Sequence, residues 1–331
     1  MGAGCRPTDG PPRENGMKAL VFDGTPRVEE LPAPEPGPGE ALVRVLSAGV
    51  CNTDLEICRG YMDFHGVLGH EFVGLVEKTP TRALEGKRVV GEINCVCHRC
   101  EWCRMEMFHH CAARTVLGIA GRPGAFAEYL TLPEENLHPV PGNIRDDVAV
   151  FTEPLAAAFR ILEQVAVGPA DRAVVLGDGK LGQLCAQVLA TRTRNLVCAG
   201  RHRWKLDLLA ARGIAVRLED EPVAPGADLV VEATGRPEGL ARALELVRPE
   251  GTLVLKSTVA ETIPLASVLA VVNEIRIVGS RCGPFRPALA ALAAGEVEVR
   301  PMITEAYDLA EGVTALARAR DPGVMKVLLR M

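Results

Sequence analysis

The fold is decided by the stretch Val174-Val175-Leu176-Gly177-Asp178-Gly179-Lys180-Leu181-Gly182. Three apolar residues lead into the spacing G-x-G-x-x-G, and a helical pattern follows. Glycines at this spacing permit a tight turn and a close approach of the backbone to a phosphate, which then lies at the helix N-terminus. The motif alone is weak. Between a strand and a helix, however, it predicts a dinucleotide-binding loop, with contacts from Gly177, Asp178, Gly179, Lys180, Leu181 and Gly182.

The segments around this loop alternate between strand and helix. Strands are predicted over 172–176, 195–199, 215–218, 228–232, 252–255 and 276–278. Helices are predicted over 180–190, 203–212 and 237–247. This alternation builds βαβ units, so the sequence predicts an α/β protein with a doubly wound parallel sheet of the Rossmann type.

The end of the second predicted strand indicates which cofactor the loop binds. An NAD site has Asp or Glu roughly 20 residues after the glycines, where the carboxylate accepts a hydrogen bond from the ribose 2′-hydroxyl. Here the strand is followed by Gly200, Arg201, His202 and Arg203, without an acid. Guanidinium groups suit a 2′-phosphate, so the sequence favours NADP, with NAD as the second option. Solvated charges at a helix start are the plainer alternative.

The residues outside this sheet have a different pattern. Residues 1–16 are rich in Gly, Pro and polar residues, and a disordered leader is expected there, not a signal peptide. Short β-rich runs, such as 41–46 and 87–90, then lie between Gly/Pro turns. A helix is expected over 147–165, interrupted at Pro154. Residues 284–331 have two short helical patterns, the second capped by Asp308, and pattern alone does not assign them to either part.

Length and composition exclude several classes of protein. A chain of 331 residues suggests about two domains. With 37 basic and 42 acidic residues the net charge is −5, which argues against a nucleic-acid-binding protein. No apolar run is long enough to span a bilayer, and no export signal is visible, so a cytoplasmic location with reduced thiols is expected. The 11 cysteines are then expected to bind metal or to pack, not to form disulfides.

Four of these cysteines have the spacing C-x2-C-x2-C-x7-C, namely Cys97, Cys100, Cys103 and Cys111. Four thiolates make a closed tetrahedral shell for zinc, which is the structural type of site. Cysteine spacing does not fix the metal, so an iron–sulfur cluster is the alternative. Cys95 is a fifth thiol nearby that could substitute in a shifted register. We expect this site to stabilise a loop and not to take part in chemistry.

A second set of possible metal ligands precedes this segment. Cys51 lies within 20 residues of His70 and Glu71, and Glu153 opens the segment that leads to the sheet. A cysteine, a histidine and a carboxylate can bind zinc and leave one position open for water or substrate. Each residue alone has an ordinary explanation in packing or surface charge, and only their combination with the other motifs indicates a site.

Together these motifs resemble the zinc-dependent medium-chain dehydrogenase/reductase family (the alcohol dehydrogenase superfamily), and within it the sorbitol and threonine dehydrogenase branch. The matching stretches follow the family's order over nearly the whole chain after the leader: MKAL at 17–20, CNTD at 51–54, GHEFVG at 69–74, the four-cysteine segment, EPLA at 153–156, the glycine-rich loop and EATG at 232–235. The resemblance implies a GroES-like catalytic domain over 17–145, a Rossmann domain over 146–283, and a return to the catalytic domain over 284–331.

The resemblance also assigns roles to individual residues. It implies that Cys51 and His70 bind a catalytic zinc, with Glu71 and Glu153 as the carboxylates at this metal, either of which is the ligand. Thr53 matches the hydroxyl that relays the alcohol proton. Asp54 matches the carboxylate that orients the ligating histidine. Thr234, in the EATG stretch, is expected at the cofactor.

The sequence departs from the family in two places. The family often has glycine directly after the first cysteine of the four-cysteine segment, and His98 stands there. Many members have a histidine in the proton relay a few residues after the catalytic cysteine, and Glu56 stands in that region. The second departure leaves the exit route of the proton open.

The resemblance implies a reversible oxidation of an alcohol, with a small alcohol or ketone as substrate. A homodimer or homotetramer is expected, assembled through the strand near residues 276–280, without nucleic-acid or membrane partners. Two alternatives are a zinc-independent quinone or enoyl reductase of the same fold and a zinc- and nucleotide-binding module without turnover. The first lacks metal ligands, and a module without turnover would have no need of Cys51, Thr53, His70 and Glu71.

Overall fold

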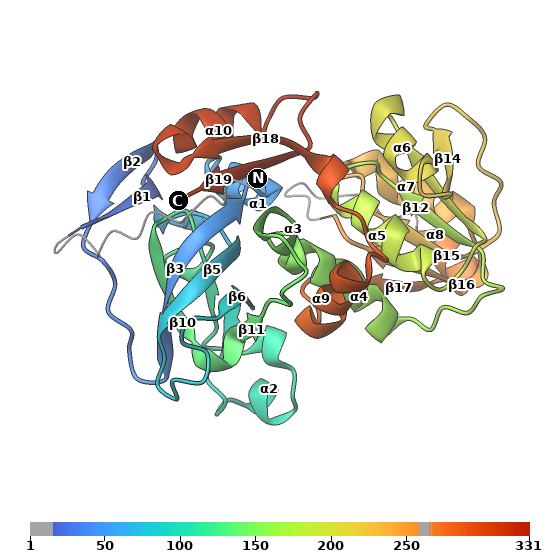
Figure 1. Cartoon of the computed structure of the whole chain (residues 1–331). Coiled ribbons are helices and arrows are strands. Elements are labelled where there is room, and N and C mark those ends of the chain that lie inside the picture. The colour runs from blue at the N-terminus through green and yellow to red at the C-terminus, as the bar shows by residue number, and fades with distance from the viewer. Residues whose placement is uncertain (1–15, 258–264, 266) are drawn as a thin grey trace.

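The computed structural model describes residues 16–257, 265 and 267–331. Nearly all of the predicted leader, residues 1–15, lies outside the described residues. Figure 1 shows a β-rich part next to a part in which helices cover a sheet, with the C-terminal strands lying on the β-rich part. Within the described residues, no helix combines the length and the apolar character needed to cross a membrane.

The second part is built on a parallel sheet of six strands in the order β14-β13-β12-β15-β16-β17. These strands are β12 (Ala173–Leu176), β13 (Leu196–Gly200), β14 (Ala215–Leu218), β15 (Ala227–Glu232), β16 (Val247–Leu255) and β17 (Arg276–Gly279). Neighbouring strands in the order are all parallel. Because the strand order reverses beside β12, the crevice at its carboxyl end is where such a sheet binds a dinucleotide.

Helices follow the strands of this sheet along the chain, and the first three of them pack against it. They are α5 (Lys180–Ala190), α6 (Arg203–Ala210), α7 (Pro237–Leu246) and α8 (Ser267–Val272). All four residues of β12 are buried, since a strand with helices on both faces has no solvent side. The predicted α/β fold with a doubly wound parallel sheet is confirmed.

The β-rich part contains a seven-stranded sheet in the order β11-β6-β5-β3-β19-β18, with β10 also paired to β3. Its strands are β3 (Glu40–Gly49), β5 (Glu71–Lys78), β6 (Arg88–Gly91), β10 (Tyr129–Pro133), β11 (Leu137–Pro139), β18 (Ile303–Asp308) and β19 (Lys326–Arg330). Side chains of β3 alternate between buried and half-buried along most of the strand, which is the period expected of a strand with one face on the core.

Smaller elements complete this part. One three-stranded sheet consists of β1 (Met17–Phe22), β2 (Pro26–Leu31) and β4 (Gly66–Val67), and another of β7 (Asn94–Cys95), β8 (Thr115–Leu117) and β9 (Gly121–Arg122). The short helices are α1 (Asn52–Ile57), α2 (Glu101–Arg104), η1 (Tyr61–Asp63), η2 (Phe108–His110) and η3 (Glu134–Asn136). The chain around β7, α2, η2 and β8 forms a lobe, residues 94–117, that carries the four-cysteine segment.

Two helices connect the two parts, and here the structure corrects one prediction. The helical region is divided into α3 (Asp146–Ala149) and α4 (Thr152–Gln164), so the interruption lies at residues 150–151 and not at Pro154. Pro154 is the third residue of α4. In the first turn of a helix the backbone N–H groups have no partner within the helix, so the missing N–H of proline costs nothing there.

The C-terminal segment joins both parts. Its helix α9 (Phe285–Ala294) packs against α4, while β19 pairs antiparallel with β3 through Leu328 and Gly49. The remaining elements are η4 (Arg300–Met302), η5 (Leu309–Glu311) and α10 (Gly312–Arg318). Asp308 and Glu311 form a capping box at the start of η5, as the sequence pattern predicted for Asp308.

Candidate active site

The glycine-rich loop takes its shape from close backbone contacts. Gly177 has a φ of 115°, and a Cβ atom there would lie 2.4 Å from the carbonyl oxygen of Ala233. At Gly182 a Cβ would lie 1.9 Å from the carbonyl oxygen of Gly177. Gly179, in contrast, faces open space. The first and third glycines are therefore required by the packing of the chain on itself, and the second leaves room for a ligand.

Thr234 follows β15 at the same edge of the sheet. The Glu232 carboxylate accepts hydrogen bonds from the Thr234 backbone N–H (2.7 Å) and from its hydroxyl (2.6 Å). Since Ala233 contacts Gly177, this turn borders the glycine-rich loop. The structure thus places Thr234 beside the loop residues with which the sequence grouped it.

The predicted specificity residues lie at the end of β13. Arg201 is exposed and lies 3.6 Å from Glu219, and Arg203 is exposed and lies 3.1 Å from Asp207. Both guanidinium groups therefore face solvent at the rim of the crevice, each with an acidic neighbour. His202 is half-buried and contacts the Asp178 carboxylate of the glycine-rich loop.

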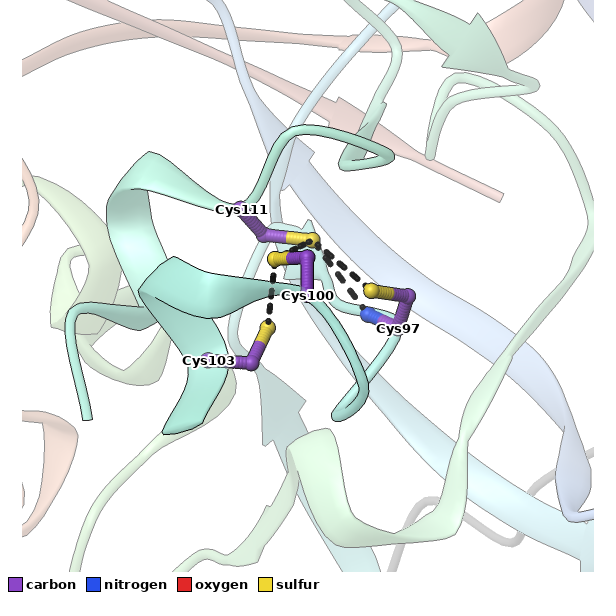
Figure 2. Close-up of side chains that lie close together, drawn as sticks. All are labelled: Cys97, Cys100, Cys103 and Cys111. Atoms are coloured by element: carbon purple, nitrogen blue, oxygen red, sulfur yellow. Dashed lines mark hydrogen bonds between the residues drawn. The ribbon is translucent and has the colours of Figure 1, made fainter. Parts of the chain in front are cut away.

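The four lobe cysteines converge on one centre (Figure 2). Their sulfur atoms all lie within 4.8 Å of one another, with Cys100 3.5 Å from Cys103 and Cys111 3.5 Å from Cys97. A tetrahedron with zinc–sulfur distances of about 2.3 Å has its sulfur atoms about 3.8 Å apart, so the set fits zinc. Cys95 is buried in β7 outside this group.

One departure from the family pattern lies at a left-handed position of the backbone. His98, which follows the first of these cysteines, has a φ of 53°. A residue with a side chain adopts this left-handed conformation at a cost of about 1–2 kcal/mol. Glycine adopts it without this cost because it has no Cβ atom. The turn after Cys97 therefore has a backbone conformation that favours glycine. The His98 ring lies 2.5 Å from the carboxylate of Glu135.

The second cluster brings together Cys51, His70 and Glu71, whose ligand atoms also lie within 4.8 Å of one another. Cys51 is the N-cap of α1, and Asp54 in the first turn accepts a hydrogen bond from its backbone N–H (2.8 Å). His70 precedes β5, and Glu71 is its first residue. A short helix and a neighbouring strand thus hold the three side chains in fixed positions.

Asp54 also faces His70. Its Oδ1 lies 3.2 Å from Nδ1 of the imidazole, and both side chains are buried. Neither atom has another hydrogen-bond partner among the described residues. A carboxylate at Nδ1 fixes the ring and leaves Nε2 available, which is the usual arrangement of a histidine that binds a metal. The donor set of thiol, imidazole and carboxylate fits zinc.

Without a metal ion, the charges at this site favour the thiolate form of Cys51 and the protonated form of the His70 ring. Burial raises the pKa of Cys51, but His70 overcomes this effect and lowers it to about 6. Burial lowers the pKa of His70, while Asp54 and Cys51 raise it well above its usual value. Burial raises the pKa of Glu153 to about 7. The charges of His70 and Cys51 act on Glu153, so it lies near the cluster without being one of its three members.

Thr53 and Glu56 lie on α1 next to the cluster. The Thr53 hydroxyl is 3.7 Å from the Cys51 sulfur, which places it beside the candidate ligands. Glu56 is partly exposed and pairs with Arg59 at 2.6 Å. Its carboxylate is therefore engaged with a surface arginine.

Sequence reasoning missed a lysine at this site. Lys326, the first residue of β19, is 1% exposed and forms an ion pair with Glu71. Its Nζ also lies 3.4 Å from the Val50 carbonyl oxygen, next to Cys51. Burial lowers the pKa of Lys326 to about 8. A single lysine in an apolar run has no spacing that would have revealed this role.

A second lysine connects the two halves of the site. Lys180 begins α5 directly after the glycines, and its Nζ lies 3.4 Å from the same Val50 carbonyl oxygen. The cofactor loop of one part is thus beside the candidate metal ligands of the other. Through this contact the glycine-rich loop and the Cys51 segment, which are about 130 residues apart in the sequence, form a single site.

The chain is similar to known proteins over nearly its whole length. Residues 37–142 match the alcohol dehydrogenase GroES-like domain. The chain is 31% identical to an L-threonine 3-dehydrogenase of Streptomyces avermitilis and 29% identical to a sorbitol dehydrogenase of Halalkalibacterium halodurans. Both alignments cover 95% of this chain and 99% of the relative.

Solved structures are similar over the same extent. A Sinorhizobium meliloti 1021 protein described as a zinc-binding dehydrogenase, solved with NADP bound, has a TM-score of 0.87 at 26% identity. This match covers 96% of this chain and all of the other. The alcohol dehydrogenase of Thermus sp. ATN1 has a TM-score of 0.85 at 29% identity, with coverage of 95% and 99%.

Proposed function

Since the chain belongs to the zinc-dependent medium-chain dehydrogenase/reductase family, in its sorbitol and threonine dehydrogenase branch, we propose that it oxidises a secondary alcohol or polyol reversibly to the carbonyl compound. The chain is an NAD(P)-dependent alcohol dehydrogenase. We further propose that the protein binds one catalytic and one structural zinc ion. We also propose that it prefers NADP(H) and accepts NAD(H) as well.

The residues of the chain have distinct tasks in this proposal. Cys51 and His70 would hold the catalytic zinc with Glu71 or Glu153, and Asp54 orients the His70 ring. When bound, zinc would supply Lewis acidity that favours loss of the hydroxyl proton, and the nicotinamide would take up the hydride. The Thr53 hydroxyl, beside Cys51, would accept and pass on that proton.

One observation carries the proposal: Lys180 of the cofactor loop and the metal-site cluster meet at Val50. A hydride can pass only between groups held in contact, so a dehydrogenase needs its nucleotide crevice to open beside its alcohol site. A nucleotide site and a metal site with unrelated functions would not need to lie next to each other. Relatives named as sorbitol, threonine and xylulose enzymes support a substrate that carries hydroxyl groups.

The direct test is a screen of polyols, amino alcohols and their ketones, which follows the absorbance of the reduced nicotinamide with NADP(H) and with NAD(H). Cys51→Ala is expected to abolish turnover while NADPH still binds. Cys58→Ala, which removes a half-buried thiol at the end of the same helix, is the matched control and should stay active. Full turnover by metal-free Cys51→Ala protein would disprove the role proposed for zinc.

We further propose that the chain forms a homodimer or homotetramer. The strand β17 is at the edge of the parallel sheet, and none of the described strands pairs with its outer side. Beside it in sequence, α8 exposes apolar side chains, with Val271 and Val272 each 73% exposed. An exposed apolar surface next to an open strand edge favours association.

A further inference from the structure

The end of β13 has no acid in its own sequence, yet the structure holds a carboxylate there. Asp178, the second residue of the glycine-rich loop, is only 6% exposed. Its Oδ2 accepts a hydrogen bond of 2.5 Å from the backbone N–H of His202, and the His202 ring lies 3.1 Å away. The carboxylate therefore bridges the loop after β12 and the turn after β13.

The position of Asp178 is fixed by Gly200, the last residue of β13. A Cβ atom on Gly200 would lie 2.4 Å from the Cβ of Asp178 and 2.7 Å from its Oδ2. The carboxylate thus occupies the space that a side chain at the strand end would take. In NAD sites of this fold, an Asp or Glu near the end of the second strand binds the ribose 2′-hydroxyl.

The two arginines after β13 do not pair with Asp178. Lys205 is buried nearby, and its pKa, which burial lowers, is partly restored by the Asp178 charge. Arg201 and Arg203 are directed instead to Glu219 and Asp207. A carboxylate has about four acceptor positions, and the backbone N–H and the ring of His202 use at most two of them, so positions remain for a hydroxyl donor.

We propose that Asp178 is a specificity-determining residue that accepts a hydrogen bond from the 2′-hydroxyl of the adenosine ribose. It replaces, from the glycine-rich loop, the acid that β13 lacks. The crevice then contains both determinants, a carboxylate for the hydroxyl of NAD(H) and arginines for the phosphate of NADP(H). This inference rests on the proposed function, and it explains why both nucleotides would be used.

The test measures nucleotide binding by calorimetry and does not depend on turnover. The ligands are NADH, NADPH and an NADH analogue with 2′-deoxyadenosine, and the proteins are the wild type, Asp178→Asn and Glu245→Gln. The last variant removes one charge from an exposed glutamate on α7 and is the matched control. The wild type and the control should bind NADH about 10-fold or more tightly than the deoxy analogue, as expected for a hydrogen bond to a charged group.

Asp178→Asn keeps only a weaker, uncharged acceptor, so it should discriminate NADH from the deoxy analogue clearly less than the wild type does, and should bind NADPH at least as tightly as the wild type. Equal binding of NADH and its analogue by the wild type would overturn the inference without any variant. An equal loss of NADH and NADPH affinity in a folded Asp178→Asn protein would overturn it as well. If the wild type binds none of the three ligands, the proposed function itself fails, and this inference with it.

Discussion

Glu71 and Lys326 form the buried ion pair on which the region of the candidate metal site depends. Both side chains are almost fully buried, at 2% and 1% exposure. Burial of two charges is compensated only while both are present, and removal of one leaves the other without a partner in a medium of low polarity. The pair also joins β5 to β19 across 255 residues of sequence.

We expect Lys326→Met to lower the free energy of unfolding by about 3–5 kcal/mol, because Glu71 keeps a buried charge without compensation. Denaturant titration followed by fluorescence measures the change. Lys87→Met, at an exposed lysine of the same part, is the control and should unfold like the wild type. The double variant Glu71→Gln with Lys326→Met should recover part of the loss. Equal stability of Lys326→Met and Lys87→Met would contradict this account.

Arg201 carries the expected preference for NADP(H). Arg201→Ala should weaken NADPH binding by about 1.5–3 kcal/mol, the value of a hydrogen bond to a charged group, and leave NADH binding nearly unchanged. Direct titration of both nucleotides measures this difference. Arg242→Ala, at an exposed arginine paired with Glu245 on α7, is the control. Equal effects of Arg201→Ala on both nucleotides would remove the reason for the preference.

The sequence predicts those site residues whose type and spacing are recognisable within a short segment. Cys51, His70 and the lobe cysteines are recognisable because metal ligands have characteristic types and spacings. Lys326 is not, because its partner Glu71 is 255 residues away and the lysine lies in an apolar run. The sequence places Asp178 in the cofactor loop but does not show its contact with the end of β13, because this loop follows a different strand of the sheet.

At the scale of elements, two glycines in the turn from β12 into α5 have different tasks. We expect Gly182 to be needed for stability and Gly179 for cofactor binding. Gly182→Ala places a methyl group 1.9 Å from the Gly177 carbonyl, so we expect a loss of stability of about 1–3 kcal/mol or more. Gly179→Ala meets no atom within 4 Å, and its φ of −71° suits alanine. That variant should melt like the wild type but lose affinity for NADPH, because the second glycine lets the pyrophosphate approach. A Gly182→Ala protein as stable as Gly179→Ala would contradict this division.

The lobe is the second element whose role can be isolated. Cys103→Ser removes one of four converging thiolates, so the zinc content should fall from about two to about one per chain, with a lower melting temperature. Cys95→Ser is the matched control, since this buried thiol lies in the same lobe outside the group, and it should keep both ions. Elemental analysis measures the zinc content, and a thermal melt measures the melting temperature. Unchanged metal content in Cys103→Ser would show that the four thiols do not hold an ion.

Element boundaries were predictable where the local pattern agreed with the packing. The helix over 180–190 is α5 without any shift, because its apolar face and its glycine start both mark it. Pro154 was wrongly taken as an interruption, because sequence alone does not show that the helix begins two residues earlier. The strand β16 begins at Val247 and not at residue 252, since Val247 pairs with Ala227 of β15 ahead of a register shift, and regular pairing resumes at Thr252.

At the scale of the whole molecule, the path of the last 48 residues could not be read from their pattern. Residues 284–331 contribute α9 to the connecting helices and β18 and β19 to the sheet of the β-rich part. The sequence of a strand does not show which distant strand it pairs with, because pairing depends on the register of partners such as β3. The family resemblance, and not the hydrophobic pattern, implied this return.

At the same scale, the surface formed by α8 and β17 predicts the oligomeric state. Light scattering after gel filtration should give at least twice the mass of one chain, because an open strand edge beside exposed valines favours pairing. The double variant Val271→Glu with Val272→Glu puts two charges on that surface and should shift the mass to one chain. Val313→Glu, at an exposed valine on α10, is the matched control and should keep the wild-type mass. A wild-type protein that elutes with the mass of a single chain would refute the proposed assembly, and a double variant that keeps its partners would place the interface elsewhere.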